Sequence, residues 1–250
     1  MGRATFDFRG DTVLVTGGTR GIGLGVSKMF LKSGAEVIAL YLNNDKEAEK
    51  AKLELSYIGK YTAIKADVSD EEKMKDVFSK INKLDFLINC AGVSYEDDII
   101  KLPMSDVRAV FETQLFGKII ACKYAFPLLQ KSDHPKVINL ASRFATKPLP
   151  GAIPLCAAEA GIVMFTKTLA MEWAQYGIRV NSVSPSLTEK TGSYYMFYTD
   201  EDAVNEGKKN PIGRLGKSED TASFIAFLCT DEAEYCNGEN INVSGGILYK

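Results

Sequence analysis

Short strand-like runs alternate with helical segments along the whole 250-residue chain. The runs that are short, apolar and rich in β-branched residues are 12–17, 36–42, 61–68, 85–92, 136–142, 178–185 and 239–246. The segments with helical spacing of apolar residues lie near 23–34, 45–59, 70–83, 105–131, 157–176 and 218–234. Strands separated by helices of this length form parallel βαβ units with right-handed crossovers. The pattern predicts an α/β fold: one doubly wound domain over residues 1–250, with a parallel sheet of about seven strands and helices on both faces.

Composition narrows the classes of function. The net charge is −2, from 30 Lys and Arg against 32 Asp and Glu, and no basic block occurs, so nucleic acid is not an expected partner. Residues 1–10 contain no apolar run and no apolar stretch approaches a membrane span, so we expect a soluble cytoplasmic protein without a membrane partner. Five cysteines without a CxxC pair indicate reduced thiols, and the lone His134 argues against a Ser-His triad and a metal site.

A glycine-rich turn follows the first predicted strand and opens the first helix, with the sequence TGGTRGIG at 16–23. Glycines allow the backbone to turn tightly and to approach a pyrophosphate, which the free N–H groups of a helix N-terminus bind. The alternative is an ordinary structural turn, because turns also collect glycine. The cofactor-binding residues predicted here are Gly17, Gly18, Thr19, Arg20, Gly21, Ile22 and Gly23.

Several further motifs occur in order along the chain. They are Asp67-Val68, Asn89-Cys90-Ala91-Gly92, GIRVNSVSP at 177–185, PIGRLGKSED at 211–220 and NGENINVSGG at 237–246. Together with the TGxxxGxG spacing, they make the chain similar to the short-chain dehydrogenase/reductase family over its whole length. The resemblance implies a Rossmann-type NAD(P)(H)-binding oxidoreductase with a mobile substrate lid at about 187–215. It also implies cofactor contacts at Asp67, Val68, Asn89, Ala91, Gly92 and Pro185.

The end of the second strand bears on which cofactor is bound. A nicotinamide dinucleotide with a free 2′-hydroxyl is usually held by an acid there. This position falls near Tyr41, and no carboxylate follows until Asp45. Arg20 in the glycine turn is suited to a 2′-phosphate, because its guanidinium donates two bonds at once. We therefore expect NADP(H) in preference to NAD(H), with a solvated surface role for Arg20 as the alternative.

The resemblance also assigns positions to the family's catalytic Ser, Tyr, Lys and Asn. In this chain they are occupied by Ser142, Leu155, Glu159 and Gln114. The resemblance thus implies a divergent member without the catalytic Tyr and Lys, in which binding at the nicotinamide end is weakened. Ser142 and Gln114 remain candidate catalytic residues, although a serine ending a strand is often only hydrogen-bonded locally. Losing a positioned general acid costs about 10²–10⁴ in rate, so ordinary ketone reduction is not expected.

Other phenols are candidates to replace the missing proton donor. Tyr95 follows the Asn89 turn and is expected at the carboxyl edge of the sheet. The lid segment contributes further aromatic residues, which serve either a flat, apolar substrate or the packing of the lid or of a subunit contact. These are Tyr194, Tyr195, Phe197 and Tyr198.

Three functions remain open on the sequence. The first is an atypical reductase of an activated small molecule, such as a conjugated alkene or an iminium ion. The second is a non-redox isomerase, lyase or cyclase that uses Glu159 as a base. The third is an inactive homologue that binds nucleotide and forms a hetero-oligomer with an active relative. The resemblance implies a homo-oligomer, dimer or tetramer, through the helices near 105–131 and 157–176, and an apolar or aromatic substrate.

Overall fold

The computed structural model describes residues 4–191 and 199–249. Its centre is a parallel sheet of seven strands in the order β3-β2-β1-β4-β5-β6-β7. The strands are β1 (Thr12–Thr16), β2 (Glu36–Tyr41), β3 (Tyr61–Lys65), β4 (Phe86–Asn89), β5 (Lys136–Leu140), β6 (Arg179–Pro185) and β7 (Asn240–Val243). The predicted α/β fold, a doubly wound Rossmann-type domain, is confirmed.

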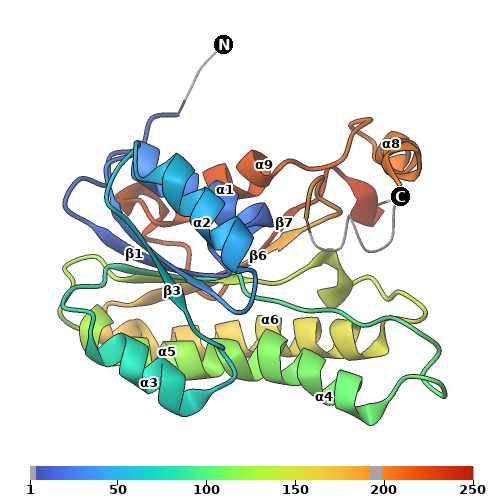
Figure 1. Ribbon diagram of the computed structural model, residues 1–250, viewed down its shortest axis with the longest axis horizontal. Coiled ribbons are helices and arrows are strands. Elements are labelled where there is room, and N and C mark those ends of the chain that lie inside the picture. Colours follow the sequence, from blue (N-terminus) through green and yellow to red (C-terminus); the bar gives the residue numbers. More distant parts are fainter. Residues whose placement is uncertain (1–3, 192–198, 250) are drawn as a thin grey trace.

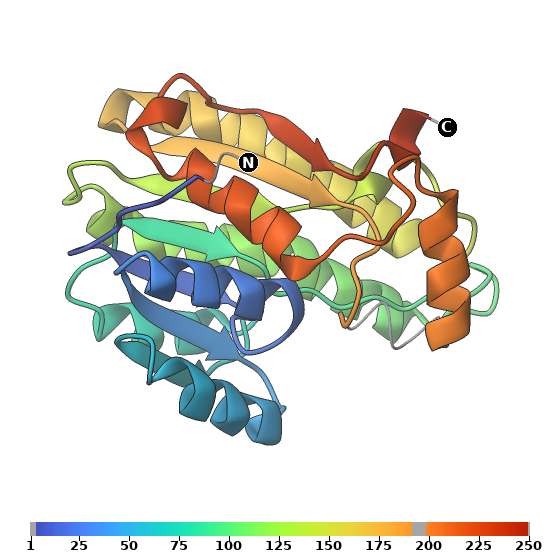
Figure 2. The ribbon, with the colours of Figure 1, turned by 90° about the horizontal axis from the view of Figure 1, so that it is seen from above.

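Helices cover both faces of the sheet (Figure 1). One face carries α1 (Gly21–Lys32), α2 (Asp45–Leu55) and α9 (Ser218–Leu228), and α1 packs along α9 (Figure 2). The other face carries α3 (Glu71–Ser79), α4 (Met104–Phe111), α5 (Gly117–Leu129) and α6 (Ile153–Trp173). Successive side chains of a strand point to opposite faces. Accordingly, Val13 and Val15 of β1 enter the core beneath α1 and α9, whereas Leu14 enters the core beneath α3 and α5.

The helix expected near 105–131 is not continuous. A π-helical turn, Glu112–Phe116, separates α4 from α5 and contains Gln114. Such turns hold one extra residue and occur often at functional sites. Gly117 begins α5 beside β3's exit loop, where an added Cβ would lie 2.7 Å from Val68 Cγ2. The helix therefore approaches the sheet closely at this point.

The helix α6 begins at Ile153, four residues before the expected start, with Pro154 in its first turn. Proline is tolerated there because the first N–H groups of a helix have no intrahelical acceptor. An additional helix, α8 (Asp200–Lys209), was not predicted and occupies part of the proposed lid. It begins with a capping box in which Thr199 and Asp202 exchange hydrogen bonds, and it lies beyond the carboxyl ends of the strands (Figure 2).

One expectation about apolar stretches is wrong. Residues Ile153–Tyr176 are long and apolar enough to cross a membrane by length and composition, with a mean hydropathy of 1.4. The helix belongs to the domain instead: it packs on β6 and on the π-helical turn, and it buries Ile162 and Leu169. Length and apolarity alone do not distinguish such a helix from a membrane span. The exposed Met164 and Met171 lie on its other side.

Candidate active site

The glycine turn lies at the point where the strand order reverses. From β1 the chain proceeds outward to β2 and β3 and then returns to β4 on the other side of β1. In open α/β sheets, ligands bind in the crevice at the carboxyl ends of two such strands. Gly17 (φ +67°) and Gly21 (φ +55°) have left-handed backbone conformations, and an added Cβ on Gly23 would overlap the Gly17 carbonyl oxygen. The close backbone approach expected of a phosphate-binding turn is therefore present.

This turn is joined to the turn that follows β4. The Ala91 amide donates a hydrogen bond to Thr16 Oγ1 at 3.0 Å. An added Cβ on Gly17 would stand 3.1 Å from Ala91 Cα. The two turns thus form one continuous rim of the crevice, which brings the predicted cofactor residues Gly17, Ala91 and Gly92 together.

The first turn of α1 faces this rim with free donors. Arg20 occupies the N-cap position with an extended backbone and makes no side-chain cap bond. The first N–H groups of a helix have no intrahelical acceptor and, with the helix dipole, bind anions. The Arg20 side chain is exposed, Gly18 and Thr19 are buried, and Ile22 is half-buried. Geometry and charge at this end suit a pyrophosphate.

The first carboxylate after β2 is that of Asp45, at the start of α2, and it is already paired. Lys65 Nζ contacts both oxygens of Asp45 at 2.9 Å, and this hydrogen bond holds the pKa of Asp45 below its usual value. Asp45 also hydrogen-bonds the half-buried Tyr41, whose pKa is raised by desolvation and by this carboxylate. The first acid after β2 is therefore neutralised by a neighbouring cation.

Asp67 and Val68, two of the predicted cofactor contacts, lie just after the end of β3. Asp67 Oδ1 accepts hydrogen bonds from the Ser69 amide at 2.9 Å and from the Ser69 hydroxyl at 2.6 Å. This local turn leads the chain toward α3. Val68 is buried against Gly117. The backbone at Asp67 and Val68 is accordingly fixed at the carboxyl edge of the sheet.

Asn89 ends β4, and its side chain is held inside the domain. Its side chain is 0% exposed, and its Nδ2 donates to Asn139 Oδ1 at 2.9 Å. Asn139 in turn donates to Thr166 on α6 at 3.0 Å. The Asn89 side chain thus takes part in a structural link between β4, β5 and α6, and the predicted contact of this residue with a cofactor stays a prediction. The backbone of Gly92 in the same turn is exposed.

Ser142 lies just beyond β5 and is half-buried. Its Oγ accepts a hydrogen bond from the Phe144 amide at 3.0 Å and thereby caps a short 3₁₀ helix, Arg143–Ala145. This is the local bond that the structural alternative for Ser142 predicts. Within 4–191 and 199–249, no side chain or carbonyl accepts the Ser142 hydroxyl proton in return, so that proton remains available to a ligand.

The side chains of Gln114 and Lys118 both donate hydrogen bonds to carbonyl groups of the turn after β4. Gln114 Nε2 donates to the Val93 carbonyl at 3.0 Å, and Lys118 Nζ donates to the Ala91 carbonyl at 3.1 Å. Lys118 Nζ also lies 3.5 Å from Gln114 Oε1. Lys118 is 2% exposed, which is unusual for a lysine. Lys118 was not predicted as a site residue, although it follows Gln114 by four residues and so lies on the same helix face.

Leu155 and Glu159 lie on the buried side of α6 and are 7% and 3% exposed. Burial raises the pKa of Glu159 to about 7, an effect that the nearby charge of Lys118 opposes. Burial also lowers the pKa of Lys118, and Glu159 opposes that shift. Among the described residues Glu159 Oε2 has no hydrogen-bond partner. An acid and an amine, both buried, therefore face each other under the crevice.

The remaining candidates are less closely tied to this site. Tyr95 is 38% exposed, and its hydroxyl makes no hydrogen bond within the described part of the chain. Pro185 is buried at the end of β6, opposite Val243 of β7. The aromatic lid residues Tyr194, Tyr195, Phe197 and Tyr198 lie outside the described residues.

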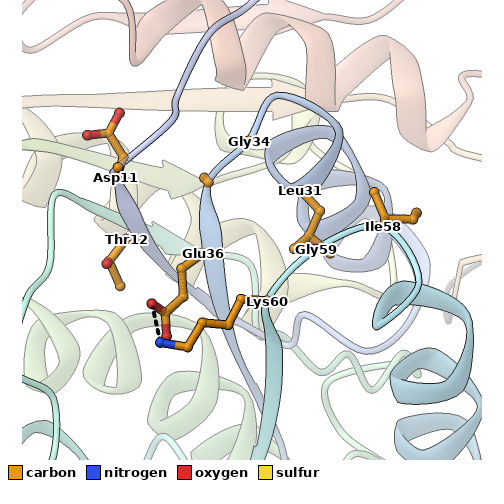
Figure 3. A pocket seen from close by; sticks show the side chains of 10 residues that line it. Asp11, Thr12, Leu31, Gly34, Glu36, Ile58, Gly59 and Lys60 are labelled. Carbon is orange, nitrogen blue, oxygen red and sulfur yellow. Dashed lines mark hydrogen bonds and ion pairs between the residues drawn. The ribbon is translucent and has the colours of Figure 1, made fainter.

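A separate pocket lies at the opposite edge of the sheet (Figure 3). Thr12 and Glu36, which begin β1 and β2, line it together with Gly34, and Lys60 pairs with Glu36 at 2.7 Å. The pocket lies at the amino ends of β1 and β2. Gly17 follows the carboxyl end of β1 and Ala91 that of β4, so this pocket is not part of the crevice. Its residues take no part in the chemistry considered below.

Comparison with known proteins assigns the chain to a family. A family model described as enoyl-(acyl carrier protein) reductase matches residues 17–248. The chain belongs to the short-chain dehydrogenase/reductase family. Members of this family are NAD(P)-binding oxidoreductases. The expected family membership is thereby confirmed.

Three similar proteins span nearly the whole of this short-chain dehydrogenase/reductase. A 3-oxoacyl-(acyl-carrier-protein) reductase of Chlamydia pneumoniae is 33% identical, over 96% of this chain and 98% of that protein. A protein of Bacillus subtilis named as a probable 2,4-dienoyl-CoA reductase is 31% identical, over 94% and 95%. The structure of a proposed NAD(P)-dependent gluconate 5-dehydrogenase from Beutenbergia cavernae, with NADP bound at low occupancy, superposes with a TM-score of 0.91. It covers 99% of this chain and 100% of its own at 24% identity, so it shows the fold alone.

Proposed function

We propose that this short-chain dehydrogenase/reductase is an NADP(H)-dependent enzyme that reduces an activated double bond, conjugated or of the iminium type, in a small apolar molecule. The observation that carries the proposal is the buried face of α6, where Leu155 and Glu159 occupy the positions that the family resemblance assigns to the proton-donating Tyr and its Lys. A leucine side chain has no proton to donate. The reaction must therefore proceed without a phenol at this position.

The proposed substrate class follows from where negative charge develops during hydride transfer. A bound NADPH supplies a hydride. When the acceptor is a ketone, the hydride leaves an alkoxide, which needs an acid at once, and loss of the acid costs about 10²–10⁴ in rate. When the acceptor is an alkene conjugated to a carbonyl, the negative charge spreads onto that carbonyl oxygen as an enolate, which water protonates later. An iminium acceptor is neutralised by the hydride and needs no proton at carbon.

The names of similar proteins support the conjugated class. The matching family model and the Bacillus subtilis relative are both named for reduction of carbon–carbon double bonds conjugated to a thioester carbonyl. The Chlamydia pneumoniae relative is named for reduction of a ketone. Both activities thus occur among the relatives by name, and the absence of an acid at Leu155 favours the first for this chain.

The preference for NADP(H) is supported at the end of β2. Asp45 is already occupied by Lys65 and Tyr41, so it is poorly placed to accept bonds from a free 2′-hydroxyl. Arg20 is exposed at the glycine turn and carries a charge that suits a 2′-phosphate. At the nicotinamide end, Ser142 and Gln114 remain the proposed polar contacts, and Tyr95 a proposed substrate contact.

A homo-oligomer is also proposed. An apolar patch on α4 and the π-helical turn includes the exposed Met104 and Phe116, and α6 exposes Met164 and Met171. These helices are the ones through which the family resemblance predicts association. Size-exclusion chromatography with light scattering tests this: a monomer at micromolar concentration contradicts it.

The decisive test is single-turnover oxidation of enzyme-bound NADPH with a set of matched acceptors. Sorbyl-CoA and crotonyl-CoA represent conjugated alkenes, a cyclic iminium ion represents the second class, and acetoacetyl-CoA is the matched ketone. We expect oxidation of NADPH by a conjugated or iminium acceptor at least about 10² times faster than by acetoacetyl-CoA. Faster oxidation by acetoacetyl-CoA, or no oxidation by any of the four, contradicts the proposal.

A second candidate rests on Glu159. A buried carboxyl group with its pKa raised to about 7 and an unpartnered oxygen has the properties of a general base. It would serve a non-redox isomerisation or elimination in the same crevice. Sorbyl-CoA and crotonyl-CoA in deuterated buffer, without NADPH, test this candidate. Exchange of carbon-bound hydrogen by the native enzyme that disappears in Glu159→Gln supports it, and absence of exchange contradicts it.

A further inference from the structure

Two opposite charges are buried together between α5 and α6. Lys118 is 2% exposed and Glu159 is 3% exposed, and each acts on the titration of the other. Among the described residues, the two side chains form no direct ion pair. The other titratable groups that act on Lys118 are the thiols of Cys90 and Cys122. Burial raises the pKa of both thiols to about 12, so they remain uncharged at neutral pH.

Neither charge is stable in this position by itself. Removing an isolated ammonium or carboxylate group from water is unfavourable unless an opposite charge and hydrogen bonds compensate. An ammonium group has three donors, and Lys118 contacts the Ala91 carbonyl at 3.1 Å and, at 3.5 Å, Gln114 Oε1. Glu159 supplies the compensating charge and keeps one oxygen without a partner in the described part of the chain. The two side chains are thus one electrostatic unit contributed by two helices.

This unit lies directly behind the rim of the crevice. The carbonyl that Lys118 holds belongs to Ala91, whose amide is bonded to Thr16 and whose Cα faces Gly17. The backbone of Ala91 therefore lies between Lys118 and the glycine turn. A charge at this depth is poorly screened by solvent and acts on whatever occupies the crevice.

We propose that Lys118 is the positioning cation of the cofactor site, with Glu159 as its counter-ion. Lys118 holds the Ala91–Gly92 turn and places a positive charge behind the rim of the crevice, where it would disfavour an oxidised, positively charged nicotinamide relative to the reduced form. Glu159 holds Lys118 in place and moderates this effect. The inference rests on the proposed binding of NADP(H) but not on the identity of the reducible substrate.

The test is the ratio of two dissociation constants, that of NADP⁺ divided by that of NADPH, measured by calorimetry at pH 8. The variants are Lys118→Met, Glu159→Gln and the double variant. The matched control is Lys123→Met, because Lys123 pairs with Glu71 on the exposed side of the same helix. We expect Lys118→Met to lower the ratio and Glu159→Gln to raise it, so that the two variants differ by about fivefold or more. The control is expected to keep the wild-type ratio.

The outcomes separate the two proposals. A purely structural role would change both dissociation constants equally, so equal ratios in all variants, with tight NADPH binding, would overturn this inference alone. If wild-type protein does not bind NADPH, this inference and the proposed cofactor both fail. If Lys118→Met does not fold, the ratio is compared between Glu159→Gln and the double variant. These two proteins differ only in the side chain at position 118. A ratio at least about threefold lower in the double variant is then expected.

Discussion

Gly23 and Gly17 lie so close together that any side chain on Gly23 would overlap the Gly17 carbonyl oxygen. This contact brings the first turn of α1 against the end of β1 and so sets the curvature of the glycine turn. The first prediction concerns this approach. Gly23→Ala is expected to weaken NADPH binding at least about tenfold, because the turn must open to admit the methyl group.

The control for this prediction is Gly10→Ala. Gly10 also has a left-handed backbone (φ +93°), but an added Cβ meets nothing within 4 Å, and the residue precedes β1 at the other edge of the sheet. That variant should lose about 1 kcal/mol of stability through backbone strain and keep its NADPH affinity. Equal NADPH affinity in both variants and the wild type contradicts the prediction.

The second prediction concerns the pH dependence of stability. Burial raises the pKa of Glu159 to about 7 in the folded chain, above the ordinary value of 4.5 for this group. The folded state therefore binds the proton more tightly than the unfolded state, so this group makes stability fall as pH rises from about 4.5 to about 7. Glu159→Gln removes the titration. Its unfolding free energy relative to wild type should rise by about 2–3 kcal/mol across that window. Urea denaturation at a series of pH values measures the difference, and a constant difference contradicts the prediction.

The third prediction concerns the stability of the buried pair. Lys118→Met leaves the Glu159 carboxylate without its counter-ion and should cost about 3–5 kcal/mol at pH 8. The double variant Lys118→Met with Glu159→Gln should recover part of this loss, because it leaves no buried charge. Lys123→Met removes an exposed partner of Glu71 and is expected to cost less than about 1 kcal/mol. Additive effects in the double-mutant cycle would show that the two buried side chains do not interact.

The fourth prediction concerns the choice of nicotinamide dinucleotide. Arg20→Gln is expected to weaken NADPH binding about tenfold and to leave NADH binding within about twofold, because only NADPH carries the 2′-phosphate. Arg9→Gln is a suitable control, since Arg9 is exposed and paired with Asp7 before β1. Equal losses for NADPH and NADH in Arg20→Gln would mean that the guanidinium contacts a group common to both.

The strands and most helices were predictable because their apolar residues recur at regular spacing. The π-helical turn at Glu112–Phe116 was not, since its sequence contains no glycine or proline and the hydrogen bond from its Gln114 goes to Val93, 21 residues earlier in the chain. The helix α8 was missed, although Thr199 and Asp202 have the spacing of a capping box.

The candidate site was predicted in part. The glycine turn was recognised from local sequence, because its conformation depends on the glycines themselves. Lys118 was not recognised: its burial is compensated by Glu159, which is distant in the sequence and meets it only after α5 and α6 pack. Asn89 was predicted from its motif alone, which does not reveal that its side chain donates a hydrogen bond to Asn139 on another strand. Side chains whose partners lie on other elements are the ones that pattern alone misplaces.

The bond between Thr16 and Ala91 also has a thermodynamic consequence. It fastens together two turns that follow different strands, so the rim of the crevice has its shape before any ligand arrives. A ligand meeting a preformed surface loses its own freedom of motion but does not have to order that of the protein. Binding along this rim is then governed by how well the ligand's phosphates match fixed donors, and the entropy of the turns contributes little.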